Sequence, residues 1–126
     1  AEIYSVVEEL PEILESIVVD LEYLGRESYM PLFVVVRPGV PFDEALKAKI
    51  RDRIRAGLSG RHVPSDIFRI EEVPRTLSGK KMELPIKKLL LGHSVAKSAN
   101  PDSMANPQSL AYFVEFAGRL NSGNAR

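Results

Sequence analysis

The sequence predicts a small α+β domain: a sheet of about three strands flanked by helices, with a helical extension at the C-terminal end. Two patterns lead to this class. Apolar residues recur with helical spacing in several segments, and short runs rich in β-branched residues lie between those segments. Helical and strand segments that alternate in 126 residues, of which 44% are hydrophobic, favour one core with helices laid against one sheet.

The N-terminal part predicts one helix and two strands. Apolar residues at i, i+3, i+4 and i+7 predict an amphipathic helix over 2–10, which Pro11 ends. Alternating apolar and acidic residues predict a strand with one solvated face over 17–24, and residues 25–29 form a polar turn. The uninterrupted apolar run 32–36 is typical of a central strand that is buried on both faces.

A long amphipathic helix is expected next, over 44–58, with Asp43 as its N-cap. Apolar residues step by four along one side, and Lys47, Arg51 and Arg55 form a basic stripe beside them. Such a stripe is most often the solvated side of a helix. It could also hold an anionic group, and Arg55 lies near the helix end, where ligands often approach.

The C-terminal part predicts a third strand over 67–70 and a turn-rich loop over 74–81. A short helix follows between the proline and the glycine that bracket 85–92. Small polar residues suggest a linker over 93–105. Asn106, with a proline directly after it, is expected to cap the last helix.

Composition excludes several classes of function. The chain has no cysteine and only two histidines, so disulfides, thiolate zinc sites and a cysteine nucleophile are excluded, and we expect no metal site. No apolar run approaches the ~20 residues of a membrane span. Seventeen basic and seventeen acidic residues cancel, so we expect no nucleic-acid partner. We also expect no membrane partner and a cytoplasmic location. Six bases and one acid in 74–97 suit an anionic small molecule.

Lys80 follows Gly79 in the most distinctive part of this basic segment. A Gly-Lys pair suggests a phosphate-binding P-loop, but Pro74 stands where that motif needs glycine and Lys81 where it needs serine or threonine. Two hypotheses stay open. Lys80 could enter the cleft of another domain and present a point charge to phosphate or carboxylate, or it could be a solvated lysine in an ordinary turn.

A longer motif around this lysine carries a resemblance to a known family. It comprises Pro74-Arg75-Thr76-Leu77-Ser78-Gly79-Lys80, and the chain starts with Ala1-Glu2-Ile3-Tyr4. With the order of strands and helix between them, these pieces resemble the C-terminal domain of AMP-forming acyl-CoA synthetases, an adenylating superfamily. The resemblance covers 1–91. It predicts a mobile C-terminal domain over 1–92, and a linker with a helical extension over 93–126.

Within that superfamily the chain is most similar to the family of acetoacetyl-CoA synthetases. The similarity lies in Arg61-His62-Val63-Pro64, in the stretch from Lys81 to Gly92, and in Ala105-Asn106-Pro107-Gln108-Ser109-Leu110. The arginine-rich helix that follows the loop in acetyl-CoA synthetases is lacking here.

The resemblance implies a two-step ligation of acetoacetate to CoA that consumes ATP and releases AMP and pyrophosphate. Lys80 matches the lysine that bridges the substrate carboxylate and the α-phosphate during adenylation, and Gly79 shapes its loop. Arg55 matches an arginine that faces the 3′-phosphate of CoA, since both lie nine residues before a proline, here Pro64. ATP, the acyl group and Mg²⁺ would bind through an N-terminal adenylation domain, so we expect these residues alone to be inactive.

Two alternatives stay open at this point. The chain does not start with methionine, and we therefore expect a domain of a longer chain. The alternative is a stand-alone anion-binding or interaction module with a basic loop. The ligase could also act on another short acyl acid, because the resemblance places the acyl pocket in the N-terminal domain.

Overall fold

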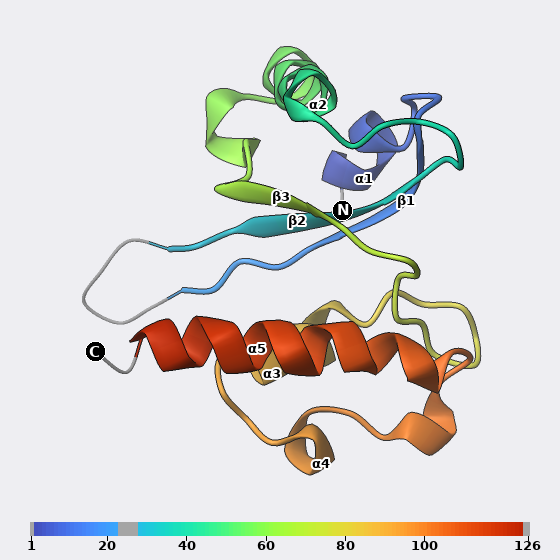
Figure 1. Ribbon diagram of the computed structural model, residues 1–126, viewed down its shortest axis with the longest axis vertical. Helices are drawn as coiled ribbons and strands as arrows, with labels where there is room; N and C mark the ends of the chain where they lie inside the picture. Colours follow the sequence, from blue (N-terminus) through green and yellow to red (C-terminus); the bar gives the residue numbers. More distant parts are fainter. Residues whose placement is uncertain (1, 23–27, 125–126) are drawn as a thin grey trace. The chain divides into compact units, whose positions relative to one another are not determined.

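The computed structural model describes residues 2–22 and 28–124. The chain divides into two compact units. We call them the sheet unit, Ala1–Val18 with Met30–Glu72, and the lysine unit, Val19–Tyr29 with Val73–Arg126. The described residues form three strands, five α-helices and three short 3₁₀ turns (Figure 1), so the predicted α+β class is confirmed. The 3₁₀ turns are η1 (Gly60–His62), η2 (Pro101–Ser103) and η3 (Pro107–Ser109).

The sheet unit is built on one mixed sheet in the order β1-β2-β3. Its strands are β1 (Ile13–Val18), β2 (Pro31–Val36) and β3 (Asp66–Arg69). The central strand β2 pairs with β1 in antiparallel orientation and with β3 in parallel orientation (Figure 1). Leu32, Phe33 and Val34 are consecutive and fully buried, which confirms the prediction of a central strand.

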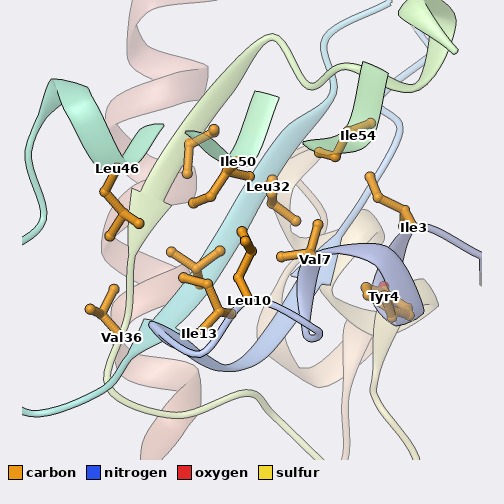
Figure 2. Close-up of a cluster of buried hydrophobic side chains, with 12 residues drawn as sticks. Ile3, Tyr4, Val7, Leu10, Ile13, Leu32, Val36, Leu46, Ile50 and Ile54 are labelled. Atoms are coloured by element: carbon orange, nitrogen blue, oxygen red, sulfur yellow. The ribbon is translucent and has the colours of Figure 1, made fainter. Parts of the chain in front are cut away.

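Two helices bury their apolar sides in this unit. α1 (Glu2–Val7) and α2 (Glu44–Gly57) are in contact, and α2 connects the parallel strands β2 and β3. Parallel neighbours need such a crossover, because a tight turn would reverse the chain. α2 starts at the predicted cap, where Asp43 accepts a hydrogen bond from the Leu46 N–H at 2.9 Å. The core cluster comprises Ile3, Tyr4, Val7, Leu10, Ile13, Leu32, Val34, Val36, Leu46, Ile50, Ile54 and Ile67 (Figure 2).

The first strand lies earlier than the predicted 17–24 and shares only residues 17 and 18 with it. The predicted alternation is present beyond the strand, since Val19 and Leu21 are buried and Asp20 is exposed. β1 starts at Ile13, and its own alternation is hidden by a register shift between Ile13 and Glu15. The polar Ser16 is also fully buried in it. This burial is possible because Glu8 accepts hydrogen bonds from the Ser16 N–H at 2.9 Å and its hydroxyl at 2.7 Å.

The first helix is shorter than predicted, since α1 ends at Val7 rather than at residue 10. The Leu10 N–H donates to the Val7 carbonyl at 3.1 Å, so the chain leaves the helix in a tight turn. Pro11 follows and has no N–H with which to continue the helix.

Ala1 and residues 23–27 lie outside the described residues, and with them the end of the predicted first strand and most of the predicted polar turn. Leu21 and Tyr29, which lie on either side of residues 23–27, form an antiparallel bridge with N···O distances of 2.8 and 3.0 Å.

The lysine unit is largely helical. Its helices are α3 (Glu83–Leu90), α4 (Val95–Ser98) and α5 (Leu110–Asn124). α3 and α5 lie side by side (Figure 1). α3 starts two residues before Pro85, whose missing N–H falls in the first turn, where no helical acceptor exists. The buried apolar side chains of this unit include Met82, Ile86, Leu89, Leu90, Met104, Leu110, Phe113, Phe116 and Ala117.

Residues 93–105 are structured, although their small polar side chains predicted a linker. The Ser94 hydroxyl caps α4 by accepting from the Lys97 N–H at 3.4 Å. The Asn100 side chain accepts from the Asp102 N–H at 3.0 Å at the start of η2. These polar residues therefore act as caps of short helical turns. The predicted boundary between the domain and its extension stays a prediction.

Candidate active site

The lysine expected to act on an anion lies in a short hairpin of the lysine unit. Arg75 and Lys81 form an antiparallel bridge at its base. One residue further in, the Thr76 N–H donates to the Lys80 carbonyl at 2.9 Å. Backbone hydrogen bonds between the two arms therefore hold a loop whose sequence is rich in turn residues.

The tip of the hairpin depends on Gly79, which the sequence analysis assigned to loop geometry. Its φ is +90°, in the left-handed region that L side chains rarely adopt. A Cβ atom there would meet no atom within 4 Å, so the backbone conformation and not the space favours glycine. Thr76 completes the turn, because its carbonyl accepts from the Gly79 N–H at 2.9 Å and its hydroxyl from the Lys80 N–H at 3.1 Å.

The side chain of Lys80 is exposed, in contrast to its well-bonded backbone. Within the described residues its ammonium has no hydrogen bond and no ion pair. The Arg75 guanidinium donates a hydrogen bond of 2.7 Å to the carbonyl of Gly79, the residue directly before Lys80. The result is an exposed cation on a hydrogen-bonded backbone, which is suited to bind a phosphate or carboxylate as a point charge.

Arg55, the second predicted site residue, lies exposed in the last turn of α2 in the sheet unit. Its Nη1 is 3.0 Å from an Asp52 carboxylate oxygen. Lys47 of the same basic stripe is paired in the same way, 3.2 Å from Glu44. Exposed pairs of this kind are worth about 0.2–1 kcal/mol, so an incoming phosphate could take over the guanidinium.

The structure brings Lys80 and Gly79 together with two residues to which the sequence analysis gave no role, Thr76 and Arg75. It also changes the role of Asn106, which was expected to cap the last helix. The Asn106 side chain makes no cap bond. It accepts from the Arg75 N–H at 3.0 Å and donates to the Val73 carbonyl at 2.9 Å. No local pattern indicates these contacts, because they span more than thirty residues.

One groove borders a predicted site residue. It has a volume of about 470 Å³, follows α2, and is lined by Leu10, three alanines, Lys49, Asp52 and Arg53. Arg55 itself does not line this groove, although its ion-pair partner Asp52 does. Among the described residues no three His, Asp or Glu side chains are grouped as metal ligands would be. None of the helices in residues 2–22 and 28–124 is long and apolar enough to cross a membrane.

The chain belongs to the family of AMP-binding enzyme C-terminal domains, whose sequence model matches residues 2–80 and so includes the hairpin through Lys80. It is similar in particular to acetoacetyl-CoA synthetases. The synthetase of Caenorhabditis elegans is 39% identical over 92% of this chain and 16% of that protein. The structure of the Streptomyces lividans enzyme is 44% identical, has a TM-score of 0.87, and is matched over 94% of this chain and 18% of that one. The predicted resemblance is therefore confirmed.

More distant relatives match less of this chain. The structure of an acyl-CoA synthetase from Brucella canis matches only 64% of this chain and 15% of its own, at 26% identity and a TM-score of 0.58. Because the Streptomyces match covers 94% of this chain, that enzyme shares most of residues 93–126, which lie beyond the family model. This chain spans about a sixth of the length of the acetoacetyl-CoA synthetases that it matches.

Proposed function

We propose that this chain is the C-terminal domain of an ATP-dependent ligase that joins acetoacetate to CoA, and that Lys80 acts in the adenylation step. The observation that carries the proposal is the exposed ammonium of Lys80, which has no partner among the residues that the structure describes and stands on a hydrogen-bonded hairpin. Its support is the 39% identity to an acetoacetyl-CoA synthetase over 92% of the chain.

In the first half-reaction an acetoacetate oxygen attacks the α-phosphorus of ATP, and the bond to pyrophosphate breaks. Negative charge accumulates on the α-phosphate oxygens, where the ammonium of Lys80 offsets it. In the second half-reaction the CoA sulfur attacks the carbonyl carbon of the adenylate and its proton passes to water, while AMP leaves with the electrons of the broken C–O bond. Lys80 has no role in this second step.

Arg55 serves the second half-reaction in this proposal, by binding the 3′-phosphate of CoA. Its exposure at the end of α2 permits such a contact, and its weak pair with Asp52 can be exchanged for a phosphate. Arg55 and Lys80 thus act in different steps from different units of the chain.

The other components lie outside this chain. An N-terminal adenylation domain would bind ATP and the acyl group. The described residues do not fit a Mg²⁺ site, since they hold no carboxylate cluster, so that domain would also hold the metal. The substrates are small and anionic, which requires no nucleic-acid or membrane partner, and we place the enzyme in the cytoplasm.

The test compares Lys80→Ala in the full-length enzyme with the substitution Lys97→Ala at another exposed lysine of the same unit, outside the hairpin. Lys80→Ala should lower acetoacetate-dependent pyrophosphate exchange by about a hundredfold or more, the size typical of losing a transition-state charge partner. Thioester formation from synthetic acetoacetyl-adenylate should stay nearly normal, and so should the melting temperature. Lys97→Ala should change none of the three.

Two results would revise the proposal in different ways. If exchange survives in Lys80→Ala, the lysine is an ordinary turn residue, and a non-catalytic anion-binding module becomes the better interpretation. If exchange depends on another short acid and not on acetoacetate, the role of the domain stands and the acyl substrate changes.

A further inference from the structure

A segment of the extension, residues 103–106, runs antiparallel to the first arm of the lysine hairpin. We call it the latch segment. The Leu77 N–H donates to the Ser103 carbonyl at 3.0 Å, and the Ala105 N–H donates to the Arg75 carbonyl at 3.0 Å. The first arm of the hairpin is therefore bonded on two sides, by the second arm and by a segment about thirty residues further along the chain.

Thr76 lies at the centre of this arrangement. On one side it forms an antiparallel bridge with Met104 of the latch segment, whose side chain is only 4% exposed. On the other side its hydroxyl accepts from the Lys80 N–H at 3.1 Å. Thr76 is therefore bonded both to the latch segment and to the backbone of Lys80, so a shift of the latch segment would also shift the lysine backbone.

Asn106 is the side chain that joins the latch segment to the hairpin. Its oxygen accepts from the Arg75 N–H and its nitrogen donates to the Val73 carbonyl, so both ends of one planar amide bind backbone groups of the hairpin arm. An asparagine before a proline at a helix start ordinarily caps the helix. Here η3 has no side-chain cap.

Arg75 links the latch segment to the residue that precedes Lys80. Its N–H is held by Asn106, its carbonyl by Ala105, and its guanidinium donates to the Gly79 carbonyl at 2.7 Å. Gly79 directly precedes Lys80. Because the Lys80 ammonium has no partner of its own among the described residues, the backbone is what decides where it can reach.

We propose that the latch segment positions Lys80 for adenylation, and that Asn106 is a positioning residue of that half-reaction. The inference rests on the proposed function of Lys80. The segment lies beyond residue 80, where the family model ends, so this positioning device is an addition to the common domain. Loss of the Asn106 amide should leave the lysine present but poorly placed, and small misplacements of a reacting group are costly.

The first experiment uses Asn106→Ala in the full-length enzyme. Acetoacetate-dependent pyrophosphate exchange should fall by roughly tenfold to a hundredfold, in kcat more than in the KM for ATP. Thioester formation from synthetic acetoacetyl-adenylate should stay nearly unchanged. A purely structural role would slow both half-reactions together, and that result would overturn the proposal.

Asn121→Ala is the matched control. Its amide nitrogen also ties the extension to the rest of the unit, donating to the Leu90 carbonyl at 3.1 Å and the Ala117 carbonyl at 2.8 Å, but away from the hairpin. This variant should lower the melting temperature about as much as Asn106→Ala does and retain pyrophosphate exchange. An equal loss of exchange in both variants would show that general destabilisation is the cause.

A second variant keeps the test decisive if Asn106→Ala does not fold. Ala105→Pro removes the N–H that donates to Arg75, and the preceding Met104 has φ −103° and ψ 142°, which a following proline permits. It should slow exchange selectively as well. Lys80→Ala is measured in parallel: if it retains exchange, the proposed function fails, whereas loss of exchange in Lys80→Ala alone overturns only the positioning role.

Discussion

The two units support their candidate site residues by different means. In the sheet unit, Arg55 stands on a regular helix whose other side is fixed in the core by Leu46, Ile50 and Ile54, all at most 5% exposed. In the lysine unit, Lys80 stands on a hairpin whose own apolar residue, Leu77, is 71% exposed. Packing therefore holds the first site, and hydrogen bonds hold the second.

This difference determines how each site should fail. Packing energy is non-directional and is shared among many contacts, so a surface change near Arg55 leaves the helix in place. Hydrogen bonds are directional, and each one contributes only about 0.5–1.5 kcal/mol net. A substitution at the hairpin should therefore displace Lys80 with little loss of folding free energy. A substitution in the core of the sheet unit should lower the folding free energy strongly, whereas a surface substitution there should leave the position of Arg55 unchanged.

The largest expected effect is on stability, in the sheet unit. Ile50→Ala leaves a cavity at a fully buried position and should lower the free energy of unfolding by about 2–5 kcal/mol. Leu14→Ala removes the same number of carbon atoms in the same unit at a position that is 42% exposed, and should cost less than half as much. Urea-induced unfolding followed by circular dichroism measures both. Equal losses would contradict a packing-supported unit.

The next effect concerns binding at the same unit. In the full-length enzyme, Arg55→Ala should weaken CoA use by about ten- to a hundredfold, equivalent to 1.5–3 kcal/mol for a lost charge-assisted contact. Pyrophosphate exchange should be nearly unaffected, and dephospho-CoA should lose much less than CoA. Lys47→Ala, in the same basic stripe, is the control. Equal losses with CoA and dephospho-CoA would show that Arg55 does not bind the 3′-phosphate.

A smaller effect is expected at the hairpin tip. Gly79→Ala forces a side chain to φ +90° and should cost about 1–2 kcal/mol, or shift the tip, with a selective loss of pyrophosphate exchange. Gly118→Ala is the control, and it should change the folding stability in the opposite direction. Gly118 lies in α5 with no atom within 4 Å of a new Cβ, so the substitution should stabilise that helix by about 0.5–1 kcal/mol. Thermal unfolding beside the exchange assay separates the two.

The smallest effect is on the pH dependence of the sheet unit. The hydrogen bond from Lys49 to Glu12, at 2.6 Å, holds the pKa of that carboxyl below its usual value. A pKa that is lower in the folded state stabilises the fold above the carboxyl's ordinary pKa, and this contribution is lost as the pH falls through the folded-state pKa. Lys49→Met should raise the Glu12 pKa and flatten the acid-side loss of stability. If an NMR titration finds the same Glu12 pKa in Lys49→Met as in the unsubstituted protein, the pairing of Glu12 with Lys49 is contradicted.

Much of the fold follows from local patterns. The four-residue spacing of apolar side chains and the Asp43 cap predicted α2, and the continuous apolar run predicted the central strand β2. β1 was misplaced because burial of Ser16 depends on the carboxylate of Glu8, and a polar residue in a strand ordinarily indicates solvent. A pattern of hydrophobicity has no means of showing which polar residue finds a partner.

Local sequence was enough to predict a turn at Lys80, because Gly79 permits the left-handed backbone of the turn and directly precedes the lysine. Only the tertiary structure decided the role of Asn106. Its amide could cap a helix locally, or bind backbone groups of Val73 and Arg75 that folding brings beside it. Folding brings distant backbone groups together, and such groups are costly when they are buried without a hydrogen-bond partner. The folded chain therefore places this amide where backbone groups need a partner, more than thirty residues from the segment whose local pattern predicted it as a cap.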